Sequence, residues 1–391
     1  SFRSSLALLV ARRALRAVAE PAMRSVSLAA LVAAVGRAQL AAASSDGGGL
    51  RGATNRSLSG VAASVDVGSG VLHDHFVLKK RYDLAAGPEA DFEFEEHSDE
   101  FLTHSCSDYT NDGSTVFSRD GNLVLKVAGK SGKSLNSGRI MSKESYRYGL
   151  FTFTAKVPKC NYVWPAIWLL PGNKDGQGPY GTWPCSGEID VLETVHDQSF
   201  GTFNVVAGYG ASSDGCYPQA QMSCNTCKPT YCTSSTMNSQ SQADRYFVQP
   251  TNCEAGDTSW EEHTFVLNWQ LDELTTWIDP VMSWDAQGNL VKVEPKAEPA
   301  AANGMKTWKT YKRQSTPTWL AVGDYHQQCF PAEVGADAPF DIGFKIVLNI
   351  AVGGYGGAPC VWGADSCSTT CGGAIGSELI MSDISIWERF E

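Results

Sequence analysis

The chain has 391 residues, and its 31 Lys and Arg against 42 Asp and Glu give a formal net charge of −11 with histidine neutral. This acidic balance argues against nucleic acid as a partner, because contacts with phosphates require a basic surface. Hydrophobic residues make up 43% of the chain and charged residues 19%, a composition typical of folded globular proteins. The length would allow two or three domains of about 150 residues, but an all-β sandwich of about 250 residues can form one domain. The 16 Phe, 13 Tyr and 11 Trp favour that architecture.

The first 71 residues show three different compositions. Residues 1–22 are an arginine-rich N-terminal extension that receives no assignment. Residues 23–43 combine a basic start, an apolar run and a stretch of small residues, which together indicate a cleavable signal peptide. Residues 44–71 are rich in Gly, Ser and Ala and predict a flexible linker. No later segment has 18 consecutive apolar residues, so we expect the protein to be soluble after the signal peptide is cleaved. The signal peptide predicts secretion to the extracellular space or the cell wall. We expect the protein to be a monomer.

The remainder, residues 72–391, is dominated by strand patterns. Short runs rich in Val, Ile, Thr and aromatic residues alternate with turn residues, and no long segment of helical period competes with them. The predicted strands are 122–127, 150–157, 162–170, 188–193, 263–268, 275–279, 344–352 and 380–387. Two polar segments, 211–253 and 286–312, interrupt the pattern and are predicted to be loop insertions on a β-sandwich.

The twelve cysteines favour disulfide bonds in an oxidising compartment, since cytosolic proteins rarely carry so many. Several of them lie in the cysteine-rich insertion 211–253. Cys224, Cys227 and Cys232 have part of the spacing of a zinc site, but no second pair follows at the spacing of a zinc finger. We therefore predict disulfides and no metal site in this segment.

Three carboxylates lie within six residues of one predicted strand, at Glu188, Asp190 and Glu193. Side chains alternate along a strand, so Glu188 and Asp190 share one face while Ile189 and Val191 lie on the other. Glu193 is out of step by one residue, and a β-bulge would bring it to the same face. Mutual repulsion in such a row raises the pKa of at least one carboxyl, as a general acid at neutral pH requires.

The spacing of Glu188 and Glu193 suggests what the row could do. With one bulge, their Cα atoms are about four strand steps of ~3.3 Å apart, and inward-leaning side chains bring the carboxyls to roughly 5 to 6 Å. This separation is typical of retaining glycosidases, in which one carboxylate attacks the sugar while the other donates and recovers a proton. An inverting pair stands about 6.5 to 9.5 Å apart.

The segment 183–193, WPCSGEIDVLE, resembles the W-P-x-x-G-E-I-D-x-x-E signature of glycoside hydrolase family 16, in the bulged form of laminarinase-type endo-β-1,3-glucanases. Further segments resemble strands of the family in order and spacing. They are 137–140, 148–158, 164–171, 348–354 and 383–387. The resemblance covers the chain from about Thr115 to its end without the insertions. It implies a concanavalin-like jelly roll, in which two antiparallel β-sheets form a sandwich with a carbohydrate cleft on the concave face.

The same resemblance implies roles for the three acids. Glu188 corresponds to the nucleophile and Glu193 to the acid/base, and Asp190 lies between them, where it tunes and orients the pair. The expected partner is a β-glucan polysaccharide, and no cofactor is required. A structural calcium ion on the convex side is left open, because acidic residues cluster at 93–96.

Four further residues are candidates for contact with the sugar. Trp183 comes first, because the family places this tryptophan beside the reacting sugar and an indole face fits the apolar face of a pyranose. Trp164, Trp168 and Arg139 are weaker candidates, since a tryptophan in an apolar strand more often belongs to the core.

Departures from the family pattern leave alternatives open. Asn204 lies where laminarinases often carry a histidine, and an amide cannot shuttle a proton. Besides hydrolysis of internal β-1,3-glucosidic bonds, the chain could transfer the glycosyl group to another glucan through the same covalent intermediate. It could also be a lectin that binds glucan without cleaving it. The linkage, whether β-1,3, mixed β-1,3/1,4 or that of a galactan, is left open because the loops around the cleft determine it.

Overall fold

The computed structural model describes residues 65–66, 69–98, 105–132, 134–158, 162–172, 178–180, 186–193, 202–206, 262–271, 273–297, 307–312, 337–354 and 371–390, and most of them form β-strands. The strands are β1 (Val65–Asp66), β2 (Val71–Arg81), β3 (Phe92–Phe94), β4 (His97–Ser98), β5 (Ser107–Tyr109), β6 (Val116–Arg119), β7 (Asn122–Lys126), β8 (Gly129–Ser131), β9 (Ser134–Ser137), β10 (Arg139–Ser142), β11 (Gly149–Lys156), β12 (Val163–Pro171), β13 (Glu188–Glu193), β14 (Thr202–Val206), β15 (His263–Gln270), β16 (Glu273–Ile278), β17 (Val281–Trp284), β18 (Leu290–Glu294), β19 (Trp308–Lys312), β20 (Phe344–Val352) and β21 (Glu378–Arg389). The described residues also include the 3₁₀ helices η1 (Pro88–Ala90) and η4 (Gly372–Ala374).

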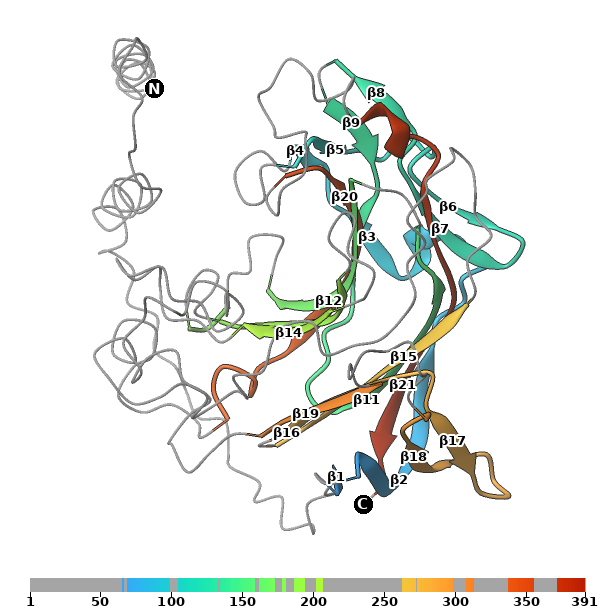
Figure 1. Ribbon diagram of the computed structural model, residues 1–391, viewed down its shortest axis with the longest axis vertical. Coiled ribbons are helices and arrows are strands. Elements are labelled where there is room, and N and C mark those ends of the chain that lie inside the picture. Colours follow the sequence, from blue (N-terminus) through green and yellow to red (C-terminus); the bar gives the residue numbers. More distant parts are fainter. Residues whose placement is uncertain are drawn as a thin grey trace. The chain divides into compact units, whose positions relative to one another are not determined.

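These strands form two large sheets and one small sheet. The larger sheet follows the order β17-β18-β2-β21-β11-β15-β16-β19, with β1, β6 and β7 attached beside this path. The second sheet has the order β14-β13-β12-β20-β10-β3 and is antiparallel throughout, and a small sheet contains β4, β5, β9 and β8. Figure 1 shows β12, β20 and β3 of the six-stranded sheet facing β11, β15 and β21 of the larger one. The prediction of an all-β, two-sheet antiparallel jelly roll is confirmed.

A shared core holds the two large sheets together. Along β11, residues Phe151, Phe153 and Ala155 point into this core, whereas the residues between them lie on the outer face. Strands β15 and β20 contribute Trp269 and Phe344, whose rings meet edge to face at 5.1 Å. Burial of one such aromatic side chain stabilises a fold by about 1.5 to 3 kcal/mol, so the period-2 pattern of the sequence is enough to fix which face of each strand lies inward.

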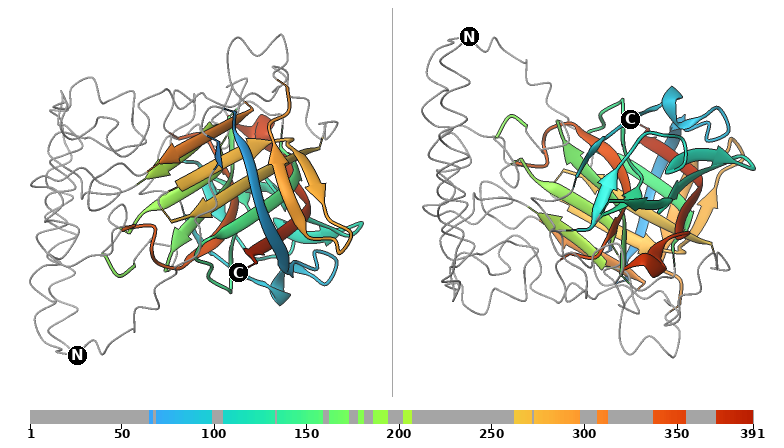
Figure 2. Two further views of the ribbon diagram at one scale, coloured as in Figure 1. Left: turned by 90° about the horizontal axis from the view of Figure 1, so that it is seen from below. Right: turned by 90° about the horizontal axis from the view of Figure 1, so that it is seen from above.

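A second, smaller core lies on the other face of the larger sheet. Trp277 of β16 is fully buried there, and its indole Nε1 donates a hydrogen bond to the carbonyl oxygen of Gly70, 2.8 Å away. Strand β18 contributes Leu290 and Val293 to this cluster. In the left view of Figure 2, the blue strand β2 lies beside the orange strands β17 and β18, which pair with it through β18.

This second core corrects two boundaries predicted from composition. The segment 286–312 is not only a loop insertion, because it contains β18 and β19. The linker predicted for residues 44–71 ends earlier, because Val65 and Asp66 form β1 and pair with Leu72 and Val71. In both segments a few apolar residues bury against the larger sheet, and average composition hides such isolated anchors.

All eight strands predicted from pattern are present, with ends that differ by at most two residues. The strands missed are short or polar. Strand β2 is the longest of these, and its register shifts between Leu78 and Lys80, so its burial does not alternate cleanly. A bulged strand of this kind carries no period-2 signal, which explains why the sequence did not indicate it.

Two cysteines lie within the described residues. Cys106 and Cys371 are fully buried in the shared core, and each is disulfide-bonded. The remaining ten cysteines, including all those of the insertion 211–253, lie outside the described residues, so the wider disulfide scheme stays a prediction. Residues 1–43, with the predicted signal peptide, also lie outside. Among the described residues, no helix has the length and apolarity needed to cross a membrane.

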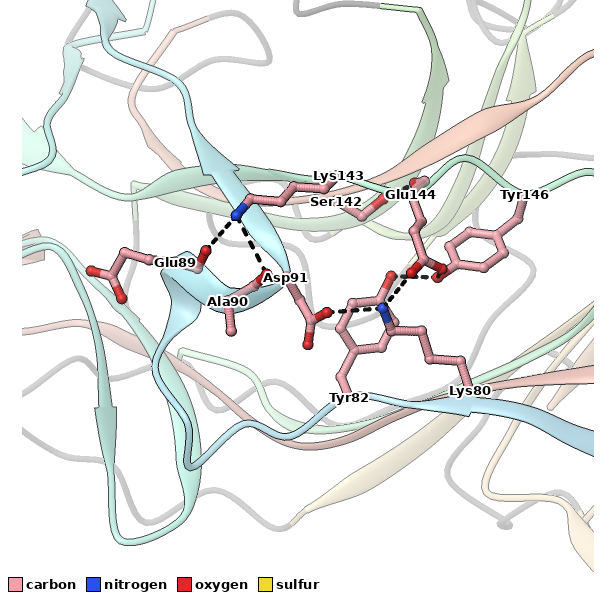
Figure 3. A network of polar contacts seen from close by, with 9 residues as sticks. All are labelled: Lys80, Tyr82, Glu89, Ala90, Asp91, Ser142, Lys143, Glu144 and Tyr146. Carbon is pink, nitrogen blue, oxygen red and sulfur yellow. Dashed lines mark hydrogen bonds and ion pairs between the residues drawn. The ribbon is translucent and has the colours of Figure 1, made fainter.

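A polar network connects the two large sheets (Figure 3). Lys80 of β2 donates hydrogen bonds to Asp91 Oδ1 and to Glu144 Oε1, both at 2.8 Å. Tyr146 OH donates to the other oxygen of Glu144 at 2.8 Å and lies 2.8 Å from Tyr82 OH. Since β2 belongs to the larger sheet and Glu144 follows β10 of the six-stranded sheet, these bonds fix one sheet against the other.

Charge makes this network dependent on pH. Burial works against the charge of Lys80, but hydrogen bonds to Asp91 and Glu144 outweigh it and raise the pKa of Lys80 from 10.5 to about 12. The stabilisation that comes from this shift is therefore complete below pH 10.5 and is lost as the pH rises through about 12. Hydrogen bonds from Lys80 and Tyr146 lower the pKa of Glu144, so its contribution is lost only in acid.

We predict that Lys80→Met lowers the free energy of unfolding by about 1 kcal/mol near pH 7, because two charge-assisted hydrogen bonds at a partly exposed site are lost. The difference from the wild type should shrink as the pH rises above 10.5 towards about 12. Urea unfolding followed by tryptophan fluorescence at several pH values measures both effects.

Lys79→Met is the matched control. Lys79 is the neighbouring residue on β2, and its Nζ lies 2.9 Å from Glu388 Oε1, but the side chains of this pair are 47% and 59% exposed. An exposed pair of this kind contributes little, so Lys79→Met should change stability by less than about 0.5 kcal/mol. Equal losses in the two variants would contradict a special role for the network.

Candidate active site

The strand that carries the three acids begins directly after a glycine that no other residue can replace without strain. Gly187 has φ +84°, in the region where residues with a Cβ are rarely found. A Cβ at this position would lie 3.0 Å from Pro339 Cγ, 3.1 Å from Phe340 and 3.2 Å from Phe344. Both the backbone conformation and the close packing therefore require glycine immediately before Glu188.

A bulge in β13 is present where the sequence predicts it. On the β12 side, Trp168 pairs with Asp190 and Ile167 pairs with Leu192, so Val191 is the extra residue. On the β14 side, the register also shifts between Asp190 and Glu193. The bulge restores Glu193 to the face of the sheet that the other two acids occupy.

The burial of the remaining residues of β13 supports this division of faces. Ile189, Val191 and Leu192 all belong to the shared core between the two large sheets. The two consecutive residues Val191 and Leu192 both point inward because Val191 is the extra residue of the bulge. Glu188 and Glu193 are partly buried on the opposite face, which we call the acid face of the six-stranded sheet.

Asp190, the central acid, is the most deeply buried of the three, with 2% of its surface exposed. Burial raises the pKa of Asp190 well above its usual range, and the charges of Glu188 and Glu193 raise it further. Its Oδ2 atom is buried without a hydrogen-bond donor among the described residues. A protonated Asp190 therefore resolves the repulsion in the row, because it removes one charge and can donate a hydrogen bond to a neighbouring carboxylate.

Trp164 contacts the last acid of the row directly. Its indole Nε1 donates a hydrogen bond of 2.9 Å to Glu193 Oε1. Trp164 is two residues before Ala166, which is the partner of Glu193 in the pairing of β12 with β13. The indole and the carboxylate are thus diagonal neighbours on the acid face, within reach of each other across the two strands.

Trp168 lies on the same face and is held by neutral and charged neighbours. Its Nε1 donates a hydrogen bond of 2.7 Å to Asn349 Oδ1 on β20. The guanidinium of Arg139 on β10 lies 5.0 Å from the centre of the Trp168 ring system and 5.8 Å from that of Tyr109. Cation–π contacts at these distances fix the plane of the Trp168 indole.

Arg139 is itself fixed by a residue that directly follows the neighbouring strand β3. It donates a hydrogen bond through Nε to Glu95 Oε2, and the two side chains are only 5% and 7% exposed. A guanidinium held in this way supports Trp168 from within the protein. Its predicted contact with sugar stays a prediction.

The structure thus joins most of the residues indicated by sequence. Glu188, Asp190, Glu193, Trp164 and Trp168 share the acid face, and Arg139 contacts the ring of Trp168. Trp183 lies outside the described residues, and so do the side chains of 202–206, which include Asn204 opposite Asp190. The predicted concave cleft over this face stays a prediction.

Sequence reasoning did not single out Asn349, Glu95 or Tyr109, which hold this face together. A signal existed for Asn349, because it is a polar residue within the apolar strand 344–352 and therefore needs a buried partner. No comparable signal marks Glu95 or Tyr109, whose roles depend on pairings between distant segments.

Among the described residues, no group of three or more His, Cys, Asp or Glu side chains is arranged to hold a metal ion. In the acidic cluster 93–96, Glu95 pairs with Arg139, and Glu93 lies 3.4 Å from Lys345 Nζ. Two of the carboxylates considered for calcium are therefore engaged by cations of the protein.

Comparison with known proteins finds a matching family model and several similar proteins. Residues 100–285 match the family described as the XgeA-like, catalytic GH16 domain. The chain is 31% identical over 221 residues to a Beta-1,3-glucan-binding protein of Penaeus monodon, covering 56% of this chain and 46% of that protein. It is 26% identical over 261 residues to a Glucan endo-1,3-beta-glucosidase of Cryptopygus antarcticus, covering 64% and 70%. This chain therefore spans about half the length of the first relative.

A solved structure is also similar. The laminarinase from Rhodothermus marinus superimposes with a TM-score of 0.49 and 18% sequence identity, covering 81% of this chain and 99% of that chain.

We predict that Gly187→Ala lowers the free energy of unfolding by about 2 to 4 kcal/mol, since it combines an unfavourable φ with a steric clash. Gly288→Ala is the control, because Gly288 has φ +83° but nothing within 4 Å of an added Cβ. That variant should lose only about 1 kcal/mol, the cost of the backbone conformation alone. Thermal or urea unfolding measures both losses, and equal values would show that packing around Gly187 is not limiting.

Proposed function

Because the chain contains a catalytic domain of glycoside hydrolase family 16, we propose that it hydrolyses internal β-1,3-glucosidic bonds of laminarin-like β-glucans with retention of configuration. The observation that carries the proposal is the row of three acids on one face of a bulged strand. A stability role alone would not bring Glu188, Asp190 and Glu193 together, because their charges repel one another.

The proposed reaction proceeds in two displacements. A Glu188 carboxylate oxygen bonds to the anomeric carbon while Glu193 protonates the leaving glycosidic oxygen. In the second step, Glu193 removes a proton from water as the water oxygen displaces Glu188 from the same carbon. Each step inverts the anomeric centre, so the product retains the β configuration.

Asp190 supports this chemistry through its protonation state. Because the pKa of Asp190 is raised well above its usual range, a protonated Asp190 can donate a hydrogen bond to a flanking carboxylate. In the first step of the reaction, Glu188 loses its negative charge and Glu193 gains one. The row then carries at most two negative charges at neutral pH instead of three, which lowers the cost of holding the acids side by side.

Trp164 and Trp168 suit the substrate proposed for this face. A pyranose presents an apolar C–H face to an indole and hydroxyl groups to neighbouring polar atoms. Trp168, with its plane fixed by Arg139 and Asn349, is the better platform of the two. Trp183 stays the family-based candidate for contact with the reacting sugar.

Binding of glucan without cleavage is the second candidate function. It is favoured by one observation, the 31% identity to a protein named as a Beta-1,3-glucan-binding protein. The intact row of three acids supports cleavage instead. Transfer to a second glucan is a third outcome, because it needs the same glycosyl-enzyme intermediate and differs only in the acceptor.

The disulfide-bonded Cys106 and Cys371 support the proposal that the protein functions in an oxidising, extracellular location. A secreted enzyme of this kind would meet its polysaccharide substrate outside the cell or in the cell wall.

We predict that Glu188→Gln lowers kcat on laminarin by at least about 1,000-fold while leaving the fold intact, because the nucleophile is removed. Reducing-end assays with sized products measure turnover, and they separate the three functions. New reducing ends indicate hydrolysis, products longer than the substrate indicate transfer, and binding without new ends indicates a lectin. Glu388→Gln, on β21 of the larger sheet, is a control that should keep wild-type rates.

The roles of the two glutamates are distinguished by rescue with azide. In Glu193→Ala, azide should restore turnover of an activated aryl laminaribioside and give a β-glycosyl azide, since azide attacks the glycosyl-enzyme. In Glu188→Ala, azide should replace the nucleophile and give the α-glycosyl azide by a single displacement. Identification of the two azides by NMR tests the assignment, and exchanged products would reverse the two roles.

A further inference from the structure

The two tryptophans of β12 on the acid face have different hydrogen-bond partners. Trp164 Nε1 donates to Glu193 Oε1 at 2.9 Å, so it reaches an acid of the row. Trp168 Nε1 donates to Asn349 Oδ1 at 2.7 Å, so it reaches a neutral amide. Both side chains are partly buried and lie four residues apart on the same strand. The sequence around the two tryptophans does not distinguish their roles, but their hydrogen-bond partners do.

We propose that Trp164 is a positioning residue for Glu193, in which the indole N–H holds Oε1 while Oε2 carries the proton exchanged with the glycosidic oxygen. The inference rests on the proposed function, because it assigns a role within that reaction. It changes the role predicted for Trp164 from a platform for sugar to a donor that orients the acid/base.

The hydrogen bond is compatible with both states of Glu193. When Glu193 is protonated on Oε2, Oε1 is a carbonyl oxygen and accepts the indole N–H. When Oε2 has given its proton to the glycosidic oxygen, Oε1 belongs to a carboxylate and accepts the same N–H more strongly, because a charged acceptor makes a stronger bond. The indole therefore stabilises the anion and makes Glu193 a better proton donor, without itself gaining or losing a proton.

Few charged groups share the acid face with Glu193 among the described residues. The neighbouring strand β12 presents Trp164 and Ala166 to it, neither of which is charged. The ionisable groups on this face are Glu188 and Asp190 on the same strand, Arg139 paired with Glu95, and Lys345 paired with Glu93. The N–H of Trp164 is thus a polar donor to Glu193 that comes from the adjacent strand.

The test is Trp164→Phe, which keeps an aromatic ring and removes the N–H. In the wild type, kcat should fall at high pH, where the acid/base loses its proton; we call this fall the alkaline limb. Because the variant lacks the N–H that stabilises the Glu193 anion, we expect its alkaline limb to lie about 1 pH unit higher. On laminarin, kcat at the wild-type optimum should fall about tenfold. On a 2,4-dinitrophenyl laminaribioside, which leaves without a proton, the loss should be less than about threefold.

Trp168→Phe is the matched control on the same strand and face. Its lost N–H bonds to Asn349, so the alkaline limb should stay at the wild-type pH, whatever happens to KM. If Trp164→Phe raises only KM and its alkaline limb stays at the wild-type pH, then Trp164 is a platform for sugar and the inference is overturned. An equal shift in both variants would also overturn it, because it would reflect a general loosening of β12.

A second measurement does not depend on the folding of Trp164→Phe. In protein labelled with ¹⁵N-tryptophan, one indole N–H resonance should titrate with the pH of the alkaline limb, and this titration should be absent in Glu193→Gln. If no indole resonance responds to Glu193→Gln, the inference fails while the proposed function stands. A wild-type chain that releases no reducing ends from laminarin overturns both.

Discussion

The single extra residue in β13 is the constraint on which the acid face depends. Without the bulge at Val191, strict alternation would place Glu193 among the core residues and Leu192 on the acid face. Burying a glutamate in an apolar core costs far more than the strand gains from a regular ladder. The apolar residues Ile189, Val191 and Leu192 therefore enforce the bulge, and the bulge in turn collects the carboxylates.

The three carboxylates repel one another, and their surroundings reduce this repulsion differently at Asp190 and at Glu193. Asp190 pairs with Trp168 of the next strand, and burial together with its two acidic neighbours raises the pKa of Asp190 well above its usual range. Glu193 receives the N–H of Trp164 instead. One acid is thus stabilised in its neutral form and another in its charged form, although they are three residues apart. Such a division of environments is what acid–base chemistry between like groups requires.

Much of this could be predicted from sequence, because the informative patterns are local. The period-2 strands and the bulge in 188–193 each depend on residues that are adjacent in the chain. Trp164 and Trp168 could be placed on a strand, but their partners could not be predicted. An indole N–H on the acid face can bond to any acceptor nearby, and which one it reaches depends on the registers of β12 with β13 and with β20.

The support of Trp168 shows why the remaining part was not predictable. Glu95, Arg139, Trp168 and Asn349 come from four strands or strand ends of one sheet, yet they are separated by up to 254 positions in the chain. Each of these residues has an ordinary interpretation alone: a surface acid, a surface base, a core aromatic and a buried amide. Only the pairings of β3 with β10, of β10 with β20 and of β20 with β12 bring them into one row. The geometry of the acid face is therefore a property of the assembled sheet, and a substitution at Glu95 can reach Trp168 without touching the catalytic strand.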